Sequence, residues 1–389
     1  MNILIVHNYY KIPGGEDTVV QNEMALLRSK GHKVIFYKRS NEELEKYHGL
    51  KKVILPFKIM FSIRTFRDIK KIIKEEKIDI VHVHNTVCVV SPSVYYAAFS
   101  LKKPVVQTIH NFRLLCPGAT LLKNGKICEE CIQKNLFHAC KYNCYRDSKM
   151  NTFAIALMTT IHKFIGTYRK ISYICLTDFN KNKLLEINTK ADKYIKSSQV
   201  YVKPNFTDYN SEIVPWEKRK NQVVYAGRLD KTKGIEIMLE AWKSVKDIEL
   251  IVCGIGPESE WCKSFIEKNG VNNVKLQGFV NHEQVMDIIS ESKALILLTQ
   301  WYEGFPMVIA ESFACGTQVI GSGIGNIGSL ILDGVNGKKV NQNSIESIVE
   351  AVNNLEDLTK STKECSDDLY SMEKNYDKLI DIYMESLKF

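Results

Sequence analysis

The fold of this chain is decided by residues 300–316, which read QWYEGFPMVIAESFACG. An apolar run typical of a strand, Ala294 to Leu298, comes just before this stretch, and helical periodicity begins near Pro306. The pattern predicts a strand, a sharp turn and the first turn of a helix. Pro is favoured there because the first four N–H groups of a helix have no partner within it, and those free donors attract an anion such as phosphate.

Two carboxylates accompany this predicted anion site. Glu303 lies in the turn, and Glu311 lies about five residues into the helix, or about 7–8 Å along its axis. One pocket can therefore use the two carboxylates on different parts of one ligand. The alternative, from this stretch alone, is an ordinary capped helix with an acidic first turn.

Strand and helix patterns alternate through the rest of the second half. Apolar, strand-like runs lie at 222–226, 248–253, 274–278, 294–298 and 318–321. This alternation predicts a doubly wound α/β domain. Arg228 and Lys233 follow the first of these strands, at the end where open α/β sheets bind ligands, and they supply two cations suited to a diphosphate.

The first half opens with a second β–α–β pattern. A buried strand at 3–6 precedes a loop containing Gly14 and Gly15, which either lets a ligand approach the backbone or is an ordinary loop. Two later strands each end in His-Asn, at His84 and His110. Because these positions match, we expect both histidines to face the ligand crevice, although a single such histidine is more often structural.

Length and charge indicate two domains with different electrostatics. A chain of 389 residues exceeds what one core usually supports. Residues 1–200 hold 33 Lys and Arg against 16 Asp and Glu, whereas residues 201–389 hold 20 against 28. The first half is therefore expected to meet an anionic partner, for which nucleic acid, anionic lipid headgroups and a phosphorylated lipid are the candidates.

A basic and apolar segment covers residues 50–78, where nine Lys and Arg alternate with bulky apolar side chains. The mixture suits a helix in the headgroup region of an anionic membrane, and the alternative is a core helix with a solvated basic face. A nucleic-acid surface is less favoured because glycines and polar aromatics are scarce. The start of the chain lacks the basic residues of a signal peptide, and no apolar run reaches the roughly 20 residues of a membrane span, so we expect a cytoplasmic, peripheral protein.

Cysteines cluster at Cys128-x2-Cys131 and Cys140-x3-Cys144. This spacing falls within the range of structural zinc sites, where four thiolates complete a tetrahedron. We therefore expect a structural zinc, with Cys116 and His138 as reserve ligands. Scattered thiols, and disulfide or redox use, remain the alternatives.

Several of these segments, in this order, resemble the family 4 retaining glycosyltransferases of the GT-B fold. The resemblance rests on the Gly227-Arg228-Leu229 loop with Lys233, the Gly254-x-Gly256-Pro257 turn, the Gly278-Phe279-Val280 segment and Glu303-x7-Glu311, with the Gly14-Gly15 loop, His110 and Pro204-Asn205-Phe206 in addition. The segment from Asn111 to Gly118, together with the cysteines, is similar to a subgroup associated with bacterial capsule, O-antigen and exopolysaccharide synthesis.

The resemblance implies two Rossmann-like domains facing each other across a cleft. Residues 1–200 would bind the acceptor and carry the Cys-rich insertion at 116–144; residues 201–367 would bind the nucleotide-sugar; and residues 368–389 would form a helix that returns to the first domain. It also implies that catalysis needs no metal, with Arg and Lys stabilising the leaving group, and the chain has no Asp-x-Asp motif.

The resemblance also implies roles for individual residues. Arg228 and Lys233 would hold the diphosphate of a UDP- or GDP-linked donor, Glu303 and His110 would contact its sugar, and Glu311 would bind the ribose. Backbone groups would complete the donor site, at Gly15, Phe279, Val280, Gly304, Phe305, Pro306, Met307 and Val308.

The expected reaction is transfer of a hexosyl or N-acetylhexosaminyl group, with retention, to a lipid-diphosphate-linked saccharide at the inner membrane face. The first alternative is a GT-B-type nucleotide-sugar epimerase, which needs no acceptor and would turn over the nucleotide-sugar alone. The second is a zinc-stabilised basic module that binds nucleic acid, in which the pairing of two glutamates with Arg228 and Lys233 would be coincidence.

Overall fold

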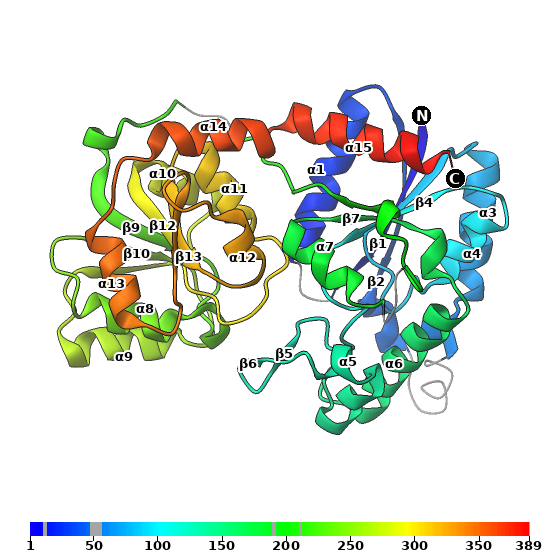
Figure 1. Cartoon of the computed structure of the whole chain (residues 1–389), viewed down its shortest axis with the longest axis horizontal. Coiled ribbons are helices and arrows are strands. Elements are labelled where there is room, and N and C mark those ends of the chain that lie inside the picture. Colours follow the sequence, from blue (N-terminus) through cyan, green and yellow to red (C-terminus); the bar gives the residue numbers. More distant parts are fainter. Residues whose placement is uncertain (11–13, 47–56, 189–191, 210–211, 389) are drawn as a thin grey trace. The chain divides into compact units, whose positions relative to one another are not determined.

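A computed structural model describes residues 1–10, 14–46, 57–188, 192–209 and 212–388. The chain forms two compact units (Figure 1). The first holds Met1–Leu121, Cys128–Lys203 and Tyr376–Phe389, and the second holds Leu122–Ile127 and Pro204–Asn375. The sequence predicts boundaries at residues 1–200, 201–367 and 368–389, and the observed second unit differs in that it also includes the short segment Leu122–Ile127.

The first unit is built on a six-stranded parallel sheet in the order β2-β1-β3-β4-β7-β8. Apolar β-branched residues fill its central strands, which are buried on both faces, as expected for a parallel sheet covered by helices. The strands are β1 Asn2–Tyr9, β2 Lys33–Ser40, β3 Ile80–Val83, β4 Val105–Ile109, β7 Ser172–Cys175 and β8 Val200–Val202.

Helices connect these strands. They are α1 Gly15–Ser29, α3 Ile63–Glu75, α4 Ser93–Phe99, α5 Glu130–Gln133, α6 Lys149–Phe164 and α7 Asp178–Leu185, with short 3-10 turns η1 Asn41–Lys46, η2 Leu136–Tyr142, η3 Tyr168–Lys170 and η4 Ser197–Gln199. The last helix, α15 Met372–Ser386, adds Leu379, Ile382 and Tyr383 to the core of this first unit, beside Ile3 and Ile5 of β1. The chain therefore finishes on the unit in which it starts.

The second unit has its own six-stranded parallel sheet, in the order β11-β10-β9-β12-β13-β14. Its strands are β9 Lys220–Ala226, β10 Glu249–Cys253, β11 Val274–Gly278, β12 Ser292–Leu297, β13 Gln318–Ser322 and β14 Gly337–Val340. Its helices are α8 Ile235–Trp242, α9 Ser259–Asn269, α10 His282–Glu291, α11 Met307–Ala314, α12 Gly325–Leu330, α13 Ile345–Asn353 and α14 Thr359–Leu369, with turns η5 Trp216–Lys218 and η6 Lys231–Lys233. A small hairpin, β5 Leu122–Lys123 and β6 Lys126–Ile127, is antiparallel.

The strand order locates the ligand-binding end of each sheet. In the second unit the order reverses between β9 and β12, and in the first unit it reverses at β1 and β3. Open α/β sheets bind ligands beyond the carboxyl ends of the strands at such points. The expected pair of Rossmann-like parallel sheets is confirmed. Among the described helices, none combines the length and the apolar character needed to cross a bilayer.

Candidate active site

An ion pair lies at the switch point of the second unit. Lys233 ends the turn that follows β9, and Glu303 lies in the loop that follows β12. The Lys233 Nζ is 2.7 Å from the Glu303 Oε1, and both side chains are largely covered, at 27 % and 12 % exposed. The parallel strands explain the meeting, because β9 and β12 are hydrogen-bonded neighbours that end at the same edge. Asn326 Nδ2 also donates to the Glu303 carbonyl, which fixes the loop.

Glycine lets the loops of this edge approach each other. Gly234, at φ +72°, closes the turn after Lys233, and a Cβ there would lie 2.0 Å from the Leu298 carbonyl oxygen. Gly254, at φ +146°, follows β10, and a Cβ there would lie 1.8 Å from the Gly227 carbonyl oxygen. Any larger residue would push the Lys233 loop away from Glu303. The close backbone contacts at Gly234 and Gly254 are therefore enough to explain why both positions are glycine.

Helix α11 presents free amides beside this pair. Pro306 is its N-cap, with φ −66° and ψ 111°, so the helix begins at Met307, one residue later than the sequence suggested. The amides of Met307 and Val308 have no acceptor among the described residues, as expected for a first helical turn. The loop residues Gly304 and Phe305 precede them and are partly exposed. The helix start is therefore open to an anion.

Glu311 is the fifth residue of α11 and pairs with a residue that the sequence analysis missed. The Glu311 Oε1 lies 2.9 Å from the His282 Nε2, at the start of α10. Glu311 is 14 % exposed, whereas His282 is 70 % exposed. The Glu311 side chain is therefore mostly covered, and a small part of it remains exposed to solvent. A lone histidine on a helix gave no signal in the sequence.

Arg228 and the Phe279 segment lie on the same edge of the second sheet. Arg228 is exposed directly after β9, and its carbonyl accepts from the Tyr225 hydroxyl at 2.7 Å. Hydrogen bonds from Thr232 lower the pKa of Asp230, although burial alone would raise it. The positive charges of Arg228 and Lys233 lower this pKa further. The turn is therefore electropositive. Phe279, after β11, is 78 % exposed.

Val280, by contrast, packs partly against the core of the second unit.

In the first unit, the two histidines predicted from strand ends are brought together. The His84 Nδ1 lies 3.0 Å from the His110 Nε2, and the rings stack with centroids 5.3 Å apart. His84 follows β3 and His110 follows β4, which are adjacent parallel strands. Both line a pocket that also contains Asn85, Asn111 and Arg113. The pocket lies entirely within the first unit.

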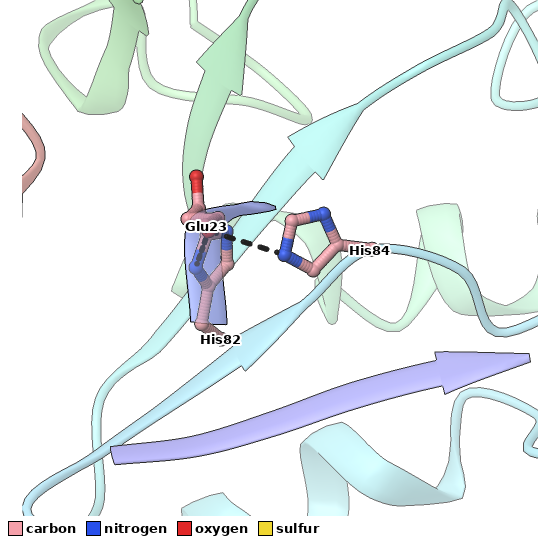
Figure 2. A group of neighbouring side chains, drawn as sticks. All are labelled: Glu23, His82 and His84. Atoms are coloured by element: carbon pink, nitrogen blue, oxygen red, sulfur yellow. Dashed lines mark ion pairs between the residues drawn. The ribbon is translucent and has the colours of Figure 1, made fainter. Parts of the chain in front are cut away.

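Behind His84 lies a buried charged group that the sequence analysis missed. Glu23, from α1, contacts the rings of both His82 and His84 (Figure 2). Its Oε1 lies 3.0 Å from the His82 Nδ1 and 3.2 Å from the His84 Nε2. Its Oε2 is 3.1 Å from the Lys203 Nζ. Burial alone would raise the pKa of Glu23, but Lys203 and His82 hold it well below its usual range. A single glutamate within the amphipathic pattern of α1 gives no signal in the sequence that it is buried.

The Gly14-Gly15 loop forms the start of α1. Gly14 is the N-cap and Gly15 the first helical residue, and both are exposed with open space around them. Asp17 closes the turn, since its Oδ2 accepts from the Gly14 amide at 3.0 Å and its Oδ1 lies 2.7 Å from the His7 Nε2. Burial, and then the Asp17 charge, raise the pKa of Glu16 to about 8.

Cys128, Cys131, Cys140 and Cys144 of the insertion form no disulfide among the described residues, and all four are partly buried. Burial, followed by the neighbouring Cys116, Cys144 and Cys128, raises the pKa of Cys131 to about 12. Cys140 has a different neighbour, because Lys149 opposes the rise in its pKa that burial causes.

Two groups of possible metal ligands have their ligand atoms within 4.8 Å of one another among the described residues. They are Glu23, His82 and His84, and His7, Glu16 and Asp17. The expected zinc ligands are not among them. His138, a reserve ligand in the sequence analysis, is instead in contact with the Glu130 carboxylate.

The basic segment predicted at 50–78 is described only from residue 57, and residues 50–56 lie outside the described parts of the chain. Helix α3 buries Ile69 and Ile73 and presents its basic residues outward, which is the arrangement of a core helix with a solvated face. Exposed apolar side chains gather just before and at its start, at Phe57, Phe61 and Ile63.

Comparison with known families places both halves of the chain. Residues 207–372 match the family described as Glycosyl transferases group 1, and residues 13–128 match Glycosyltransferase Family 4. The two matches together cover most of the chain, one in each half. The match over residues 207–372 contains Arg228, Lys233, Glu303 and Glu311, and the match over residues 13–128 contains His110.

Individual relatives agree in length and fold. An uncharacterised glycosyltransferase of Methanocaldococcus jannaschii is 25 % identical over 94 % of this chain and 92 % of its own. An uncharacterised 42.6 kDa protein in the cps region of Klebsiella pneumoniae is 23 % identical over 85 % and 87 %. The structure of Anabaena HepE in complex with UDP has a TM-score of 0.68 at 15 % identity, over 99 % of this chain and all of that one.

Proposed function

Because the chain belongs to the family 4 glycosyltransferases, we propose that it transfers a sugar from a nucleotide-diphosphate donor to a saccharide acceptor, with retention at the anomeric carbon. The observation that carries the proposal is the Lys233–Glu303 pair at the switch point of the second unit, beside the open start of α11. A cation, a carboxylate and free amides at one sheet edge match the diphosphate, the sugar hydroxyls and the phosphate oxygens of such a donor.

We assign each part of the donor to residues of the chain. Lys233 and Arg228 hold the diphosphate, Glu303 the sugar hydroxyls and Glu311 the ribose hydroxyls. The amides of Gly304, Phe305, Met307 and Val308, around Pro306, face the phosphate and sugar. Backbone groups at Phe279 and Val280 contact the base, and the Gly15 amide contacts a phosphate oxygen. His110 contacts the transferred sugar. The donor is UDP- or GDP-linked, and the UDP complex of HepE supports that class.

The chemical step is front-face substitution. The bond from the anomeric carbon to the diphosphate oxygen breaks, the bond from that carbon to the acceptor oxygen forms on the same face, and the acceptor proton passes to the departing diphosphate. Lys233 and Arg228 stabilise the negative charge that develops on that leaving group, and preorganised charges of this kind contribute about 2.7–4 kcal/mol each. In this proposal they do the work that a divalent metal does in other transferases.

The acceptor is proposed to be a lipid-diphosphate-linked saccharide that receives a hexosyl or N-acetylhexosaminyl group in the synthesis of a surface polysaccharide. The similarity to a protein of a Klebsiella cps region supports this pathway. Residues 1–200 carry 17 more basic than acidic side chains, which suits an anionic acceptor and membrane surface. Phe57, Phe61 and Ile63 are the apolar anchors, and Arg64 and Arg67 are the adjacent charges.

The thiols of the insertion are proposed to hold one structural zinc. The sequence spacing indicates Cys128, Cys131, Cys140 and Cys144 as ligands. The thiols whose charges raise the pKa of Cys131, however, are Cys116, Cys144 and Cys128. The favoured ligand set therefore replaces Cys140 with Cys116. A zinc ion would deprotonate these thiols and link the loop before α5 to the loop before α6.

The experiment that tests the proposed function is a transfer assay with purified protein, a panel of UDP- and GDP-sugars, and lipid-diphosphate-linked acceptors. Transfer requires both substrates and gives a product with the anomeric configuration of the donor. Turnover of a nucleotide-sugar without any acceptor would instead identify an epimerase. Inversion of configuration would contradict the front-face step.

A further inference from the structure

The buried group behind His84 continues as a chain of contacts to the site. It starts at Lys203 after β8, passes through the Glu23 carboxylate and the His84 ring, and ends at His110. Glu23 is 1 % exposed and His84 is 4 % exposed, whereas His110 reaches the surface of its pocket. His84 and His110 both line the pocket, but His84 is almost wholly buried, so His110 is the member of the chain that offers a ligand the larger exposed surface.

The charge of Glu23 determines where the proton of His84 lies. A carboxylate only accepts hydrogen bonds, so a ring nitrogen that lies 3.2 Å away must carry a proton, because a lone pair there would be repelled. Burial, and then the neighbouring His82, lower the pKa of His84 to about 4, so the ring is neutral near pH 7. The one proton of His84 is therefore on Nε2, and its Nδ1 is an acceptor.

The same logic extends one ring further. The His84 Nδ1 faces the His110 Nε2 at 3.0 Å, so His110 must donate from Nε2. Burial, and then His84, hold the pKa of His110 well below its usual range, so this ring is also neutral. Its Nδ1 then has a lone pair and no partner among the described residues.

A metal ion is a poorer explanation of these contacts, even though Glu23, His82 and His84 lie close together. The Lys203 ammonium already lies 3.1 Å from the carboxylate and supplies its positive charge. Both nitrogens of His82 also have hydroxyl neighbours, with the Nδ1 2.7 Å from the Tyr383 hydroxyl and the Nε2 2.8 Å from the Thr108 hydroxyl.

We infer that Glu23 and His84 are positioning residues that fix His110 as its Nε2-protonated tautomer, so that its Nδ1 accepts a hydrogen bond from a hydroxyl of the ligand. This assignment rests on the proposed function for the identity of that ligand, a sugar, but not for the tautomer. The site therefore selects a ligand that donates a hydroxyl hydrogen to His110 and rejects one that presents only an acceptor there.

The direct test is the nitrogen chemical shifts of His110 in the full chain labelled with ¹⁵N-histidine, with the signals assigned by their loss in His110→Gln. The expected spectrum at neutral pH shows a protonated Nε2 and an unprotonated Nδ1. A protonated Nδ1 in the unaltered protein overturns the inference. This measurement needs no turnover, so failure of the proposed function and failure of the inference are distinguishable.

Variants then test the cause. Glu23→Gln keeps the shape of the side chain but removes its charge, and a mixture of His110 tautomers is expected. If this single variant does not fold, Glu23→Gln combined with Lys203→Met replaces it, because the double variant leaves no unpaired buried charge. Thr108→Val is the matched control, since it changes a contact of His82 outside the chain, and the His110 tautomer is expected to persist. A single unchanged tautomer in both Glu23 variants contradicts the role of Glu23. In the transfer assay, kcat/KM is expected to fall about tenfold in Glu23→Gln, the loss of about one hydrogen bond.

Discussion

The Lys233 Nζ lies 2.7 Å from the Glu303 Oε1, across two loops that follow neighbouring parallel strands. Without a donor each side chain neutralises the other. In the proposed function, a bound nucleotide-sugar would offer the ammonium a diphosphate and the carboxylate a sugar hydroxyl, and the pair would keep both groups in place until the donor binds. The contact brings together two residues that are 70 positions apart.

Glu303→Ala is expected to reduce turnover more than donor affinity. Lys233 keeps its diphosphate contact in this variant, but the sugar loses the carboxylate that orients it for the step. Steady-state kinetics should show a lower kcat with a smaller change in donor KM. Glu236→Ala, which removes the exposed partner of Lys231, is the control and should leave both constants unchanged. A change in KM alone for Glu303→Ala would assign the residue to binding only.

Much of this site follows from sequence because strands, glycines and charged loop residues are local signals. The order of strands and helices predicted both sheets, and parallel neighbours explain why His84 meets His110. Glu23 and His282 were missed for a physical reason. The partners of Glu23 lie in or just after strands that are distant in sequence. One polar residue inside an amphipathic helix does not show in sequence whether it faces solvent or a buried cation.

The charge pattern of α3 is another feature whose structural role could not be predicted from the sequence. Its basic and apolar residues fit both a membrane-bound helix and a core helix, and the burial of Ile69 and Ile73 shows that the apolar stripe is used within the protein. Only packing against α4 distinguishes these arrangements. Among the described residues of the segment, Phe57, Phe61 and Ile63 are exposed apolar side chains, and they are the ones proposed to meet a membrane.

Membrane binding is expected to depend on these three side chains and on salt. Phe57→Ser together with Ile63→Ser should weaken sedimentation with vesicles that contain anionic lipid, since both burial of apolar surface and charge attraction contribute. High salt should weaken binding of the unaltered protein, because it screens the attraction. Leu369→Ser, at an apolar residue of similar exposure in the second unit, is the control. Equal binding to neutral vesicles in high salt would refute the basic surface.

The free energy of unfolding should depend on pH through the protonation of Glu16. Its pKa is raised from 4.5 to about 8, so the folded chain holds a proton that the unfolded chain has lost between those pH values. The free energy of unfolding of the unaltered protein should therefore fall between pH 4.5 and pH 8, relative to Glu16→Gln, which has no proton to lose. Urea unfolding of both proteins across this range measures the difference. A difference that does not vary with pH would contradict the raised pKa.

Zinc content should separate two neighbouring cysteines. Cys131→Ser is expected to abolish bound zinc in protein purified without chelator, whereas Cys140→Ser should retain about one zinc per chain. Metal analysis by mass spectrometry, on unaltered protein first, measures this. Absence of zinc from the unaltered protein would reject the metal site, and loss of zinc in Cys140→Ser with retention in Cys116→Ser would restore the ligand set indicated by sequence spacing.

The most direct test of the account is thermal unfolding of the unaltered protein and of Lys233→Ala with a panel of UDP- and GDP-sugars. We expect one donor to stabilise the unaltered protein, by about 2.7 kcal/mol at 100 times its Kd. Lys233→Ala is expected to lose about 2–4 kcal/mol of donor binding and with it the shift in unfolding temperature. Lys231→Ala, at an exposed lysine two residues away, should keep the shift. An equal shift in Lys233→Ala, or no shift with any nucleotide-sugar, would contradict the donor site at Lys233 and Glu303.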